Sequence, residues 1–356
     1  MEKFKKFLAK KNIEISAKRY LIDALGAMAQ GLFCSLLIGT IIKTIGVQTG
    51  ISFITDIGTY AMAVSGPAMA VAIGYALKAD PMVLFSLAAV GHAANAEGGA
   101  GGPLAVLFIA IIAAEFGKAV SKETKIDILV TPGVTIFIGV ALAKLIAPPI
   151  GKAAGAFGIL IENATALQPF WMGIVVSVLV GIALTLPISS AAICAVLGLT
   201  GLAGGAAVAG CCAQMVGFAV ISFKVNKWGG LVSQGIGTSM LQMPNIVKNP
   251  RIWIAPIVAS AITGPIATCV FKLTMNGEPI NSGMGTCGFC GPIGVITGWF
   301  APSEKAISRG AAAIAPNAVD WIGLILICIV LPAVISYAVN MLLKKLNWVK
   351  DEDFAL

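Results

Sequence analysis

A histidine, an amide and a carboxylate lie close together in one glycine-rich stretch, residues 91–103. His92, the only histidine of the chain, is followed by Asn95 and Glu97. On a helix His92 and Asn95 share a face, and Glu97 lies where the helix would end in glycines. In apolar surroundings such groups predict recognition of solute hydroxyls, or a proton site at Glu97. The alternative is a polar turn at an interface, with a satisfied histidine.

Two further glycine-rich segments, residues 229–250 and 277–302, carry hydroxyl and amide side chains in mildly apolar surroundings. These groups can replace the hydration shell of a neutral polar solute, while glycines admit the solute close to the backbone. Alternatively, they only satisfy backbone groups that broken helices leave free. The predicted solute-binding residues are His92, Asn95, Glu97, Thr238, Ser239, Gln242, Asn245 and Asn281.

The other reactive side chains form no catalytic or metal-binding pattern. Cys287 and Cys290 have the spacing of a metal or redox pair, but the sequence has no second pair at ribbon spacing and its histidine is remote. No Ser/His/Asp arrangement, HExxH, Walker loop or dinucleotide fingerprint is present. We therefore expect no catalytic residue, no bound metal and no cofactor.

The composition indicates which elements position these groups. Of 356 residues, 58% are hydrophobic and 11% charged, and the mean hydropathy is +0.94. An ordinary soluble domain is about 25% charged, so the composition predicts an integral membrane protein. It excludes a soluble enzyme, a coiled coil, a disordered regulator and a disulfide-stapled secreted domain. The 41 glycines and 17 prolines favour broken and closely packed helices.

Positive charge gathers at the start of the chain. Seven of the 24 lysines and arginines precede the first apolar run. Residues 1–19 are therefore predicted to form a basic amphipathic segment on anionic headgroups, which holds the N-terminus in the cytoplasm. Residues 347–356 are predicted to form a cytoplasmic tail. Despite the net charge of +8, this pattern does not indicate a nucleic-acid partner.

Apolar runs of about 20 residues predict an all-α polytopic membrane protein with eight to ten transmembrane helices. Residues 20–147 are expected to form a first helical half, ended by Pro148 and Pro149. Residues 148–168 are expected to form an amphipathic helix in the membrane interface. Residues 169–346 are expected to form the second half.

Within the second half, the two glycine-rich segments 229–250 and 277–302 are predicted to be re-entrant hairpins. Non-helical backbone at membrane depth is tolerated only where protein or a watery cavity satisfies its amides. The alternative is two ordinary glycine-rich loops. The glycines expected to act as hinges and close-packing points are Gly98, Gly99, Gly101, Gly102, Gly283, Gly285, Gly288 and Gly291.

One stretch, MPNIVKNPRIWIAP at residues 243–256, resembles the membrane-embedded IIC components of the bacterial phosphotransferase system. In those components a GLPIVLNP run leads into a helix that opens IPFI. From about residue 18 to residue 346, the chain is similar to a IIC-like subgroup that includes the perfringolysin O regulator family. The shared features are the glycine run of residues 91–103, the QMPNIVKNP segment and the GMGTCGFCGP loop.

This resemblance implies a homodimeric permease in the bacterial plasma membrane, with two re-entrant hairpins and both termini in the cytoplasm. A sugar would bind near the midplane of the bilayer and be phosphorylated on release by a cytoplasmic IIB protein. That protein is expected to be a separate chain, because no IIA or IIB domain is recognisable here. Phosphoenolpyruvate-dependent sugar phosphorylation would need such separate proteins.

One departure from the resemblance concerns the solute. In sugar-binding relatives a glutamate in the loop before the LPIVLNP run holds sugar hydroxyls. The equivalent region here, residues 235–239, contains no acid, and the role falls at about Gly237 or Thr238. Either Glu97 takes this role, or the solute is not a typical phosphotransferase sugar.

The sequence thus predicts a permease that moves a small polar solute, with a sugar as the first candidate, inward by alternating access. Two alternatives stay open. One is a membrane sensor built on a permease fold, which signals through the basic N-terminal segment to a cytoplasmic partner. The other is a proton-coupled secondary transporter that does not phosphorylate its solute.

Overall fold

The chain folds almost entirely into helices, as the sequence predicts. The computed structural model describes residues 2–356, and the side chains from residue 6 onward. In this part of the chain the only β-type pairing is an isolated bridge between Gly201 and Met275. The helices form two compact units, Met1–Ala154 and Gly155–Leu356. Each unit has its own packing and is described separately.

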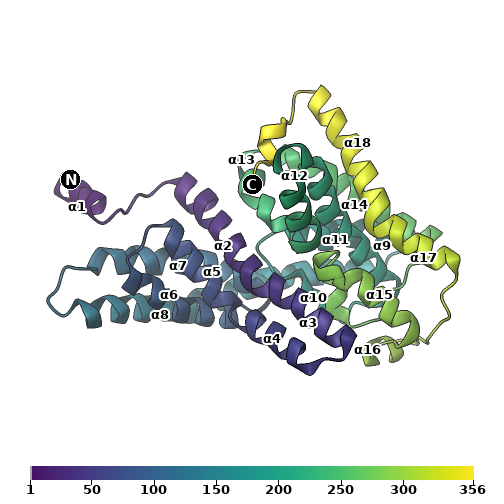
Figure 1. Cartoon of the computed structure of the whole chain (residues 1–356), viewed down its shortest axis with the longest axis horizontal. Coiled ribbons are helices and arrows are strands. Elements are labelled where there is room, and N and C mark those ends of the chain that lie inside the picture. The colour runs from purple at the N-terminus through teal and green to yellow at the C-terminus, as the bar shows by residue number, and fades with distance from the viewer. Residues whose placement is uncertain (1) are drawn as a thin grey trace. The chain divides into compact units, whose positions relative to one another are not determined.

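The helices of the first unit range from 9 to 39 residues in length (Figure 1). Helix α8 extends from the first unit into the second. The bounds are α1 Glu2–Lys10, α2 Ala24–Leu32, α3 Ile38–Thr49, α4 Ser52–Ala63, α5 Ser65–Ala76, α6 Pro81–Gly98, α7 Gly102–Val120 and α8 Asp127–Thr165.

The second unit contains the remaining helices (Figure 1). They are α9 Pro169–Thr185, α10 Ser190–Leu197, α11 Gly201–Ile221, α12 Phe223–Val232, α13 Met243–Lys248, α14 Ile254–Pro265, α15 Cys290–Phe300, α16 Glu304–Ile307, α17 Ala318–Ile325 and α18 Leu331–Lys345.

Helices α6 and α7 form a tight hairpin. Residues 98–102, four glycines and Ala100, make the turn, and at the opposite end the Ser121 hydroxyl donates to the Asp80 carboxylate over 2.9 Å. The two helices have 18 and 19 residues, or about 27–29 Å each at helical rise. That length matches the hydrocarbon core of a bilayer, so each helix is long enough to cross it once.

Six helical segments of the described chain are long and apolar enough to cross a membrane, or seven when α4 and α5 are taken as one span bent by 47°. One of the six, Pro81–Val120, is the α6–α7 hairpin. Counting the arms of this hairpin singly, and adding the shorter apolar helix Pro169–Thr185, brings the number into the predicted range of eight to ten.

The prediction that Pro148 and Pro149 end a helix is wrong. Helix α8 runs through Pro132, Pro148 and Pro149 for 39 residues without a break. Proline lacks an amide hydrogen and costs a helix one hydrogen bond, but its fixed φ is compatible with helix geometry, and membrane helices tolerate it. Residues 148–165 therefore continue α8 rather than start a separate helix, and their position in the membrane interface stays a prediction.

Helix α11 lies at the centre of the second unit and packs against α9, α14 and α18. Its Gly/Ala-rich sequence allows this, because small side chains let helix backbones approach closely. A Cβ atom added at Gly210 would overlap the backbone oxygen of Ser177 on α9, and one at Gly264 on α14 would overlap that of Gly173. These contacts leave no room for a larger residue.

The close approach of α11 to α9 predicts that Gly210→Ala destabilises the protein by about 1–3 kcal/mol, because the methyl group must displace backbone. The matched control is Gly155→Ala on α8, where an added Cβ has nothing within 4 Å. We expect this control to be neutral or slightly stabilising, since alanine favours helix more than glycine does. Thermal unfolding of the detergent-solubilised variants measures both, and equal midpoints for the two would contradict the packing argument.

Candidate functional site

Residues 229–250 fold as a hairpin of short pieces rather than as one helix. After α12 come a π-helical turn at Ser233–Gly237, an extended residue at Thr238 and a 3-10 turn at Ser239–Gln242, and then α13 begins. The Thr238 hydroxyl accepts a hydrogen bond from the Met240 amide and caps the 3-10 turn. The breaks leave polar backbone and side chains inside the unit, where other protein groups satisfy them. A re-entrant position in the membrane stays a prediction.

A chain of buried amide side chains runs along this hairpin. The Gln234 side chain donates to the Ser222 hydroxyl over 2.8 Å, and Gln242 donates to Gln234 over 2.9 Å. Asn245 then donates to Gln242 over 2.9 Å. All four residues are buried. The structure therefore joins two predicted solute-binding residues, Gln242 and Asn245, in one hydrogen-bonded chain.

A second buried network lies deeper in the unit, and Gln214 on α11 is its centre. The Gln214 side-chain oxygen accepts from Trp253 over 2.8 Å and from Thr185 over 3.2 Å, and its nitrogen donates to Ser260 over 3.2 Å. Ser239 joins through a 2.8 Å hydrogen bond to Thr185. This network connects three helices with the hairpin tip, and it includes the predicted residue Ser239.

Gln214 is not among the solute-binding residues predicted from the sequence, although the sequence does single it out. It is the only amide side chain in the otherwise apolar helix Gly201–Ile221, and it is fully buried. Polar groups within transmembrane helices face the protein interior and often mark functional positions. A lone glutamine in such a helix is therefore a reasonable candidate from sequence alone.

The second predicted hairpin, residues 277–302, is closed at its base. The Ser303 amide donates to the Asn276 carbonyl over 2.9 Å, and the Gly277 amide donates to the Gly294 carbonyl over 3.1 Å. Its turn at Cys287–Phe289 contacts the Ser233–Gly237 turn of the first hairpin. The two hairpins thus meet inside the second unit.

The predicted close-packing glycines of this hairpin lie against buried backbone. A Cβ atom at Gly285 would overlap Cys211 on α11, and one at Gly283 would overlap the Ser190 carbonyl. Gly285 and Gly288 also have positive φ angles, a conformation that favours glycine. Asn281, the predicted binding residue here, is half-buried beside Gly294, and no hydrogen bond in the described chain links its side chain to either amide network.

The Cys287–Cys290 pair shows no metal site or disulfide in the described residues. Both side chains are buried, where a cysteine packs as a small apolar residue. The structure therefore adds nothing that would make this pair a redox centre.

The histidine-containing group lies at the end of α6 in the first unit. The helix ends at Gly98, as predicted from the glycine run. His92 is exposed, whereas Asn95 and Glu97 are half-buried. Glu97 forms an ion pair with Lys144 on α8, and no hydrogen bond in the described chain connects it with His92 or Asn95. The three side chains therefore do not form one hydrogen-bonded cluster.

Glycines after Glu97 bring the α6–α7 turn close to other backbone. Gly99 has a positive φ of 49°. A Cβ atom at Gly101 would lie 2.8 Å from the Ile150 carbonyl of α8, and one at Gly102 would lie 2.5 Å from the Asn95 side-chain oxygen. Gly98 is packed next to Ala105. These positions hold the turn against α8.

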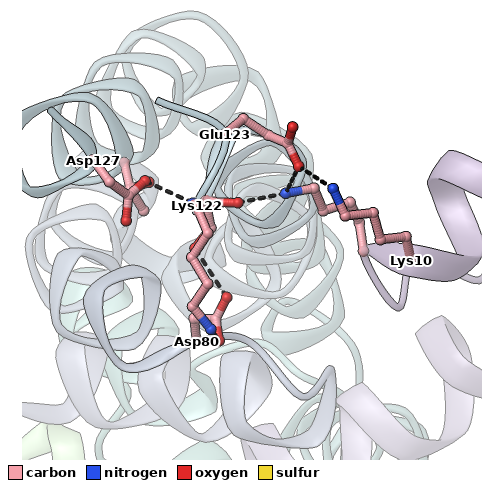
Figure 2. Close-up of polar contacts among 8 residues, drawn as sticks. Lys10, Asp80, Lys122, Glu123 and Asp127 are labelled. Atoms are coloured by element: carbon pink, nitrogen blue, oxygen red, sulfur yellow. Dashed lines mark hydrogen bonds and ion pairs between the residues drawn. The ribbon is translucent and has the colours of Figure 1, made fainter. Parts of the chain in front are cut away.

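The basic N-terminal segment is docked on the loop after α7 (Figure 2). Glu123 accepts hydrogen bonds from Lys10 and Lys11, at 2.9 and 2.5 Å. On the same loop Lys122 pairs with Asp80 over 2.7 Å, and its backbone amide donates to Asp127 over 2.7 Å. The N-terminal lysines therefore lie at the same end of the unit as the loop between α7 and α8, in keeping with their predicted common side of the membrane.

Hydrogen bonds from Lys11 and then Lys10 lower the pKa of Glu123 from 4.5 to about 2. Because the pKa is lowered in the folded state, the ion pair stabilises docking above pH 4.5 and is lost as the pH falls through about 2. Glu123 lies at the exposed surface, so salt screens this ion pair strongly.

The Glu123 contact predicts that Glu123→Gln releases the segment of residues 2–12 at neutral pH. Hydrogen exchange in that segment should rise in the variant, and raising the salt concentration should produce the same rise in the unmodified protein. Glu162→Gln removes an exposed charge elsewhere and is the control. It should change neither the exchange of residues 2–12 nor the dependence of that exchange on salt. Exchange that is the same in all three proteins would show that Glu123 does not hold the segment.

The fold and the buried networks define a class of protein. The chain is a multi-pass α-helical membrane protein with two broken, polar hairpins in its second unit. The sequence profile of the family "Phosphotransferase system, EIIC" matches residues 22–356. The chain therefore belongs to this family and is a membrane transporter component of the phosphotransferase type. No curated protein and no solved structure matches the chain.

Proposed function

We propose that this protein carries a small hydroxylated solute, a sugar, across the bacterial plasma membrane by alternating access. A separate cytoplasmic IIB protein phosphorylates the solute as it is released. Membership of the EIIC family supports the sugar and the IIB partner. The basic N-terminal segment supports cytoplasmic termini, because cytoplasmic segments carry an excess of lysine and arginine. A homodimer and the perfringolysin O regulator subgroup remain part of this proposal.

The observation that carries the proposal is the network around Gln214. Burying an amide in an apolar environment costs free energy unless it is hydrogen-bonded. In this network an amide, three hydroxyls and an indole form hydrogen bonds with one another among apolar helices. Hydroxyl groups and amides both donate and accept, so they can exchange partners with sugar hydroxyls. Thr238, Gln242 and Asn245 are buried in the same hairpin as Ser239.

Within the first unit by itself, the proposal assigns solute binding to His92, Asn95 and Glu97. The carboxylate of Glu97 would accept from sugar hydroxyls in place of the glutamate that the 235–239 region lacks. Lys144 is its ion-pair partner in this structure. The role of Asn281 is to donate to the solute from the second hairpin.

The transport proposal predicts that Gln214→Leu lowers solute uptake by about 10–100-fold, because removal of one buried hydrogen-bonding partner leaves others unsatisfied. The measurement is uptake into liposomes across a panel of sugars and polyols, with and without IIB protein and phosphoenolpyruvate. Gln168→Leu, an exposed position before α9, is the control and should transport normally. Full uptake in Gln214→Leu would remove this network from the solute path.

The same assay tests Glu97 and the energy source. Glu97→Gln should abolish uptake, whereas Lys144→Gln should retain it, since only the first removes the carboxylate. Equal effects of the two variants would indicate a structural ion pair. Uptake that collapses with the proton gradient and needs no phosphoenolpyruvate would replace phosphorylation by proton coupling.

One observation favours a second candidate function, a membrane sensor. The N-terminal segment is docked through Lys10 and Lys11, and such a charged contact can release the segment to a cytoplasmic partner. Deleting residues 1–16 separates the two functions. A carrier should keep solute binding and uptake, and a sensor should lose its regulatory output while binding persists. Loss of solute binding itself would contradict both.

A further inference from the structure

The last residues of the sequence return from α18 and bind the first hairpin. We call residues 347–356 the tail; its end lies beside α12 and α13 (Figure 1). The backbone carbonyl of Phe354 accepts hydrogen bonds from Asn226 at 2.7 Å and from Gln242 at 3.0 Å. The next carbonyl, of Ala355, accepts from Asn245 at 2.8 Å. Two predicted solute-binding amides are thus occupied by the chain itself.

Side chains anchor the tail on both sides of these bonds. Phe354 is completely buried, with 0% exposure. Asp351 pairs with Lys224 over 2.7 Å and also with Lys344. Hydrogen bonds from Lys224, and then from Lys344, keep the pKa of Asp351 below its usual range. Val349 is also buried, so the tail is bound by two apolar side chains and one pair of charged contacts.

The tail also connects the two ends of the hairpin. Asn226, before the hairpin, donates to Phe354, and Asn249, at its end, donates to the Asp353 carboxylate over 2.9 Å. Any movement that separates these ends must break one of the contacts. The segment that closes the hairpin is covalently connected to the rest of the unit only through α18.

A carbonyl oxygen and a solute hydroxyl are interchangeable acceptors for an amide N–H. While Phe354 and Ala355 hold the N–H groups of Gln242 and Asn245, those groups are not available to another ligand. Departure of the tail would leave unsatisfied donors on two buried amides, Gln242 and Asn245, and on the half-buried Asn226, which is costly. A ligand with several acceptor oxygens would compensate for that loss.

We propose that the tail is an intramolecular latch, a peptide ligand that occupies Gln242 and Asn245 and must leave before hairpin 229–250 can move or bind a solute. Its inhibitory role rests on the proposed transport function. The latch itself is a conformational equilibrium of the second unit, and its measurement needs no transport.

The first test compares hydrogen exchange of residues 233–249 in full-length protein and in Phe354→Ala, both in lipid nanodiscs. Loss of the buried ring should release the tail and raise exchange in the hairpin about tenfold or more, with α9 and α11 still protected. Leu356→Ala changes an exposed side chain and is the matched control. Unchanged hairpin exchange in Phe354→Ala would overturn the latch.

If Phe354→Ala fails to fold, Asp351→Asn takes its place, because it removes the two ion pairs without changing packing. Hairpin exchange should again rise above that of the unmodified protein, by less than in Phe354→Ala. The difference should disappear at high salt, where the ion pairs are screened in both proteins. Hairpin exchange equal to that of the unmodified protein at low salt would overturn the proposal.

The second test adds a synthetic peptide, NWVKDEDFAL (residues 347–356), to protein that lacks residues 349–356. The peptide should bind and restore protection of the hairpin, and a peptide with alanine in place of the phenylalanine should bind on the order of 100-fold more weakly. A structural tail that folds only as part of the intact chain would not rebind from solution, and absence of binding would overturn the latch.

Uptake into liposomes then separates failure of the latch from failure of the transport proposal. We expect Phe354→Ala to transport faster than Leu356→Ala. If exchange shows a released tail but uptake falls, transport needs the bound tail, and its inhibitory role is overturned. If the peptide rebinds and no variant transports any solute, the transport proposal fails and the latch stands.

Discussion

The second unit depends on the mutual satisfaction of buried amides and hydroxyls. In a bilayer, no water is present to complete the hydrogen bonds of a broken helix. The hairpin of residues 229–250 therefore places its side chains so that Gln234, Gln242 and Asn245 bond to one another, and Ser239 bonds to Thr185. Gln214 then ties this arrangement to α14. The same groups that hold the fold together are the ones able to exchange hydrogen bonds with a solute.

The buried position of Gln214 explains the form of α11. A helix that carries Gln214 to the centre must be surrounded on all sides, and only small residues allow α9 and α14 to approach closely enough. Gly210 and Gly264 provide that approach. Gly285 of the second hairpin packs against another part of the α11 surface. The glycine-rich composition is thus a consequence of packing broken and intact helices around one polar centre.

Much of the fold follows from hydropathy alone, because apolar runs of membrane length are strong local signals. The all-helical architecture follows from these runs, and the end of α6 at Gly98 follows from the glycines after Glu97. The continuation of α8 through Pro148 and Pro149 does not, since the local cost of proline argues for a stop. Membrane helices tolerate proline, so its presence alone does not mark the end of a helix.

The residue types of the candidate site were predictable from the sequence, but the contacts that join these residues were not. Hydroxyl and amide residues in a proline-interrupted segment indicated the hairpin, and the structure joins Gln242 with Asn245. The pairing of Glu97 with Lys144 depends on how α6 packs on α8, and no sequence spacing shows it. The docking of the tail on Gln242 likewise joins residues more than a hundred positions apart. A short charged sequence after a helix predicts a solvated tail, because its one buried ring is not visible from composition.

The central claim is that the two hairpins enclose a polar centre within the hydrocarbon layer. A cryo-electron microscopy map of the protein in lipid nanodiscs, recorded with a transported solute, tests it most directly. We predict both hairpin turns inside the hydrocarbon layer, with solute density beside Gln214 and Ser239. Hairpin turns at headgroup level around a dry, sealed centre would contradict the account.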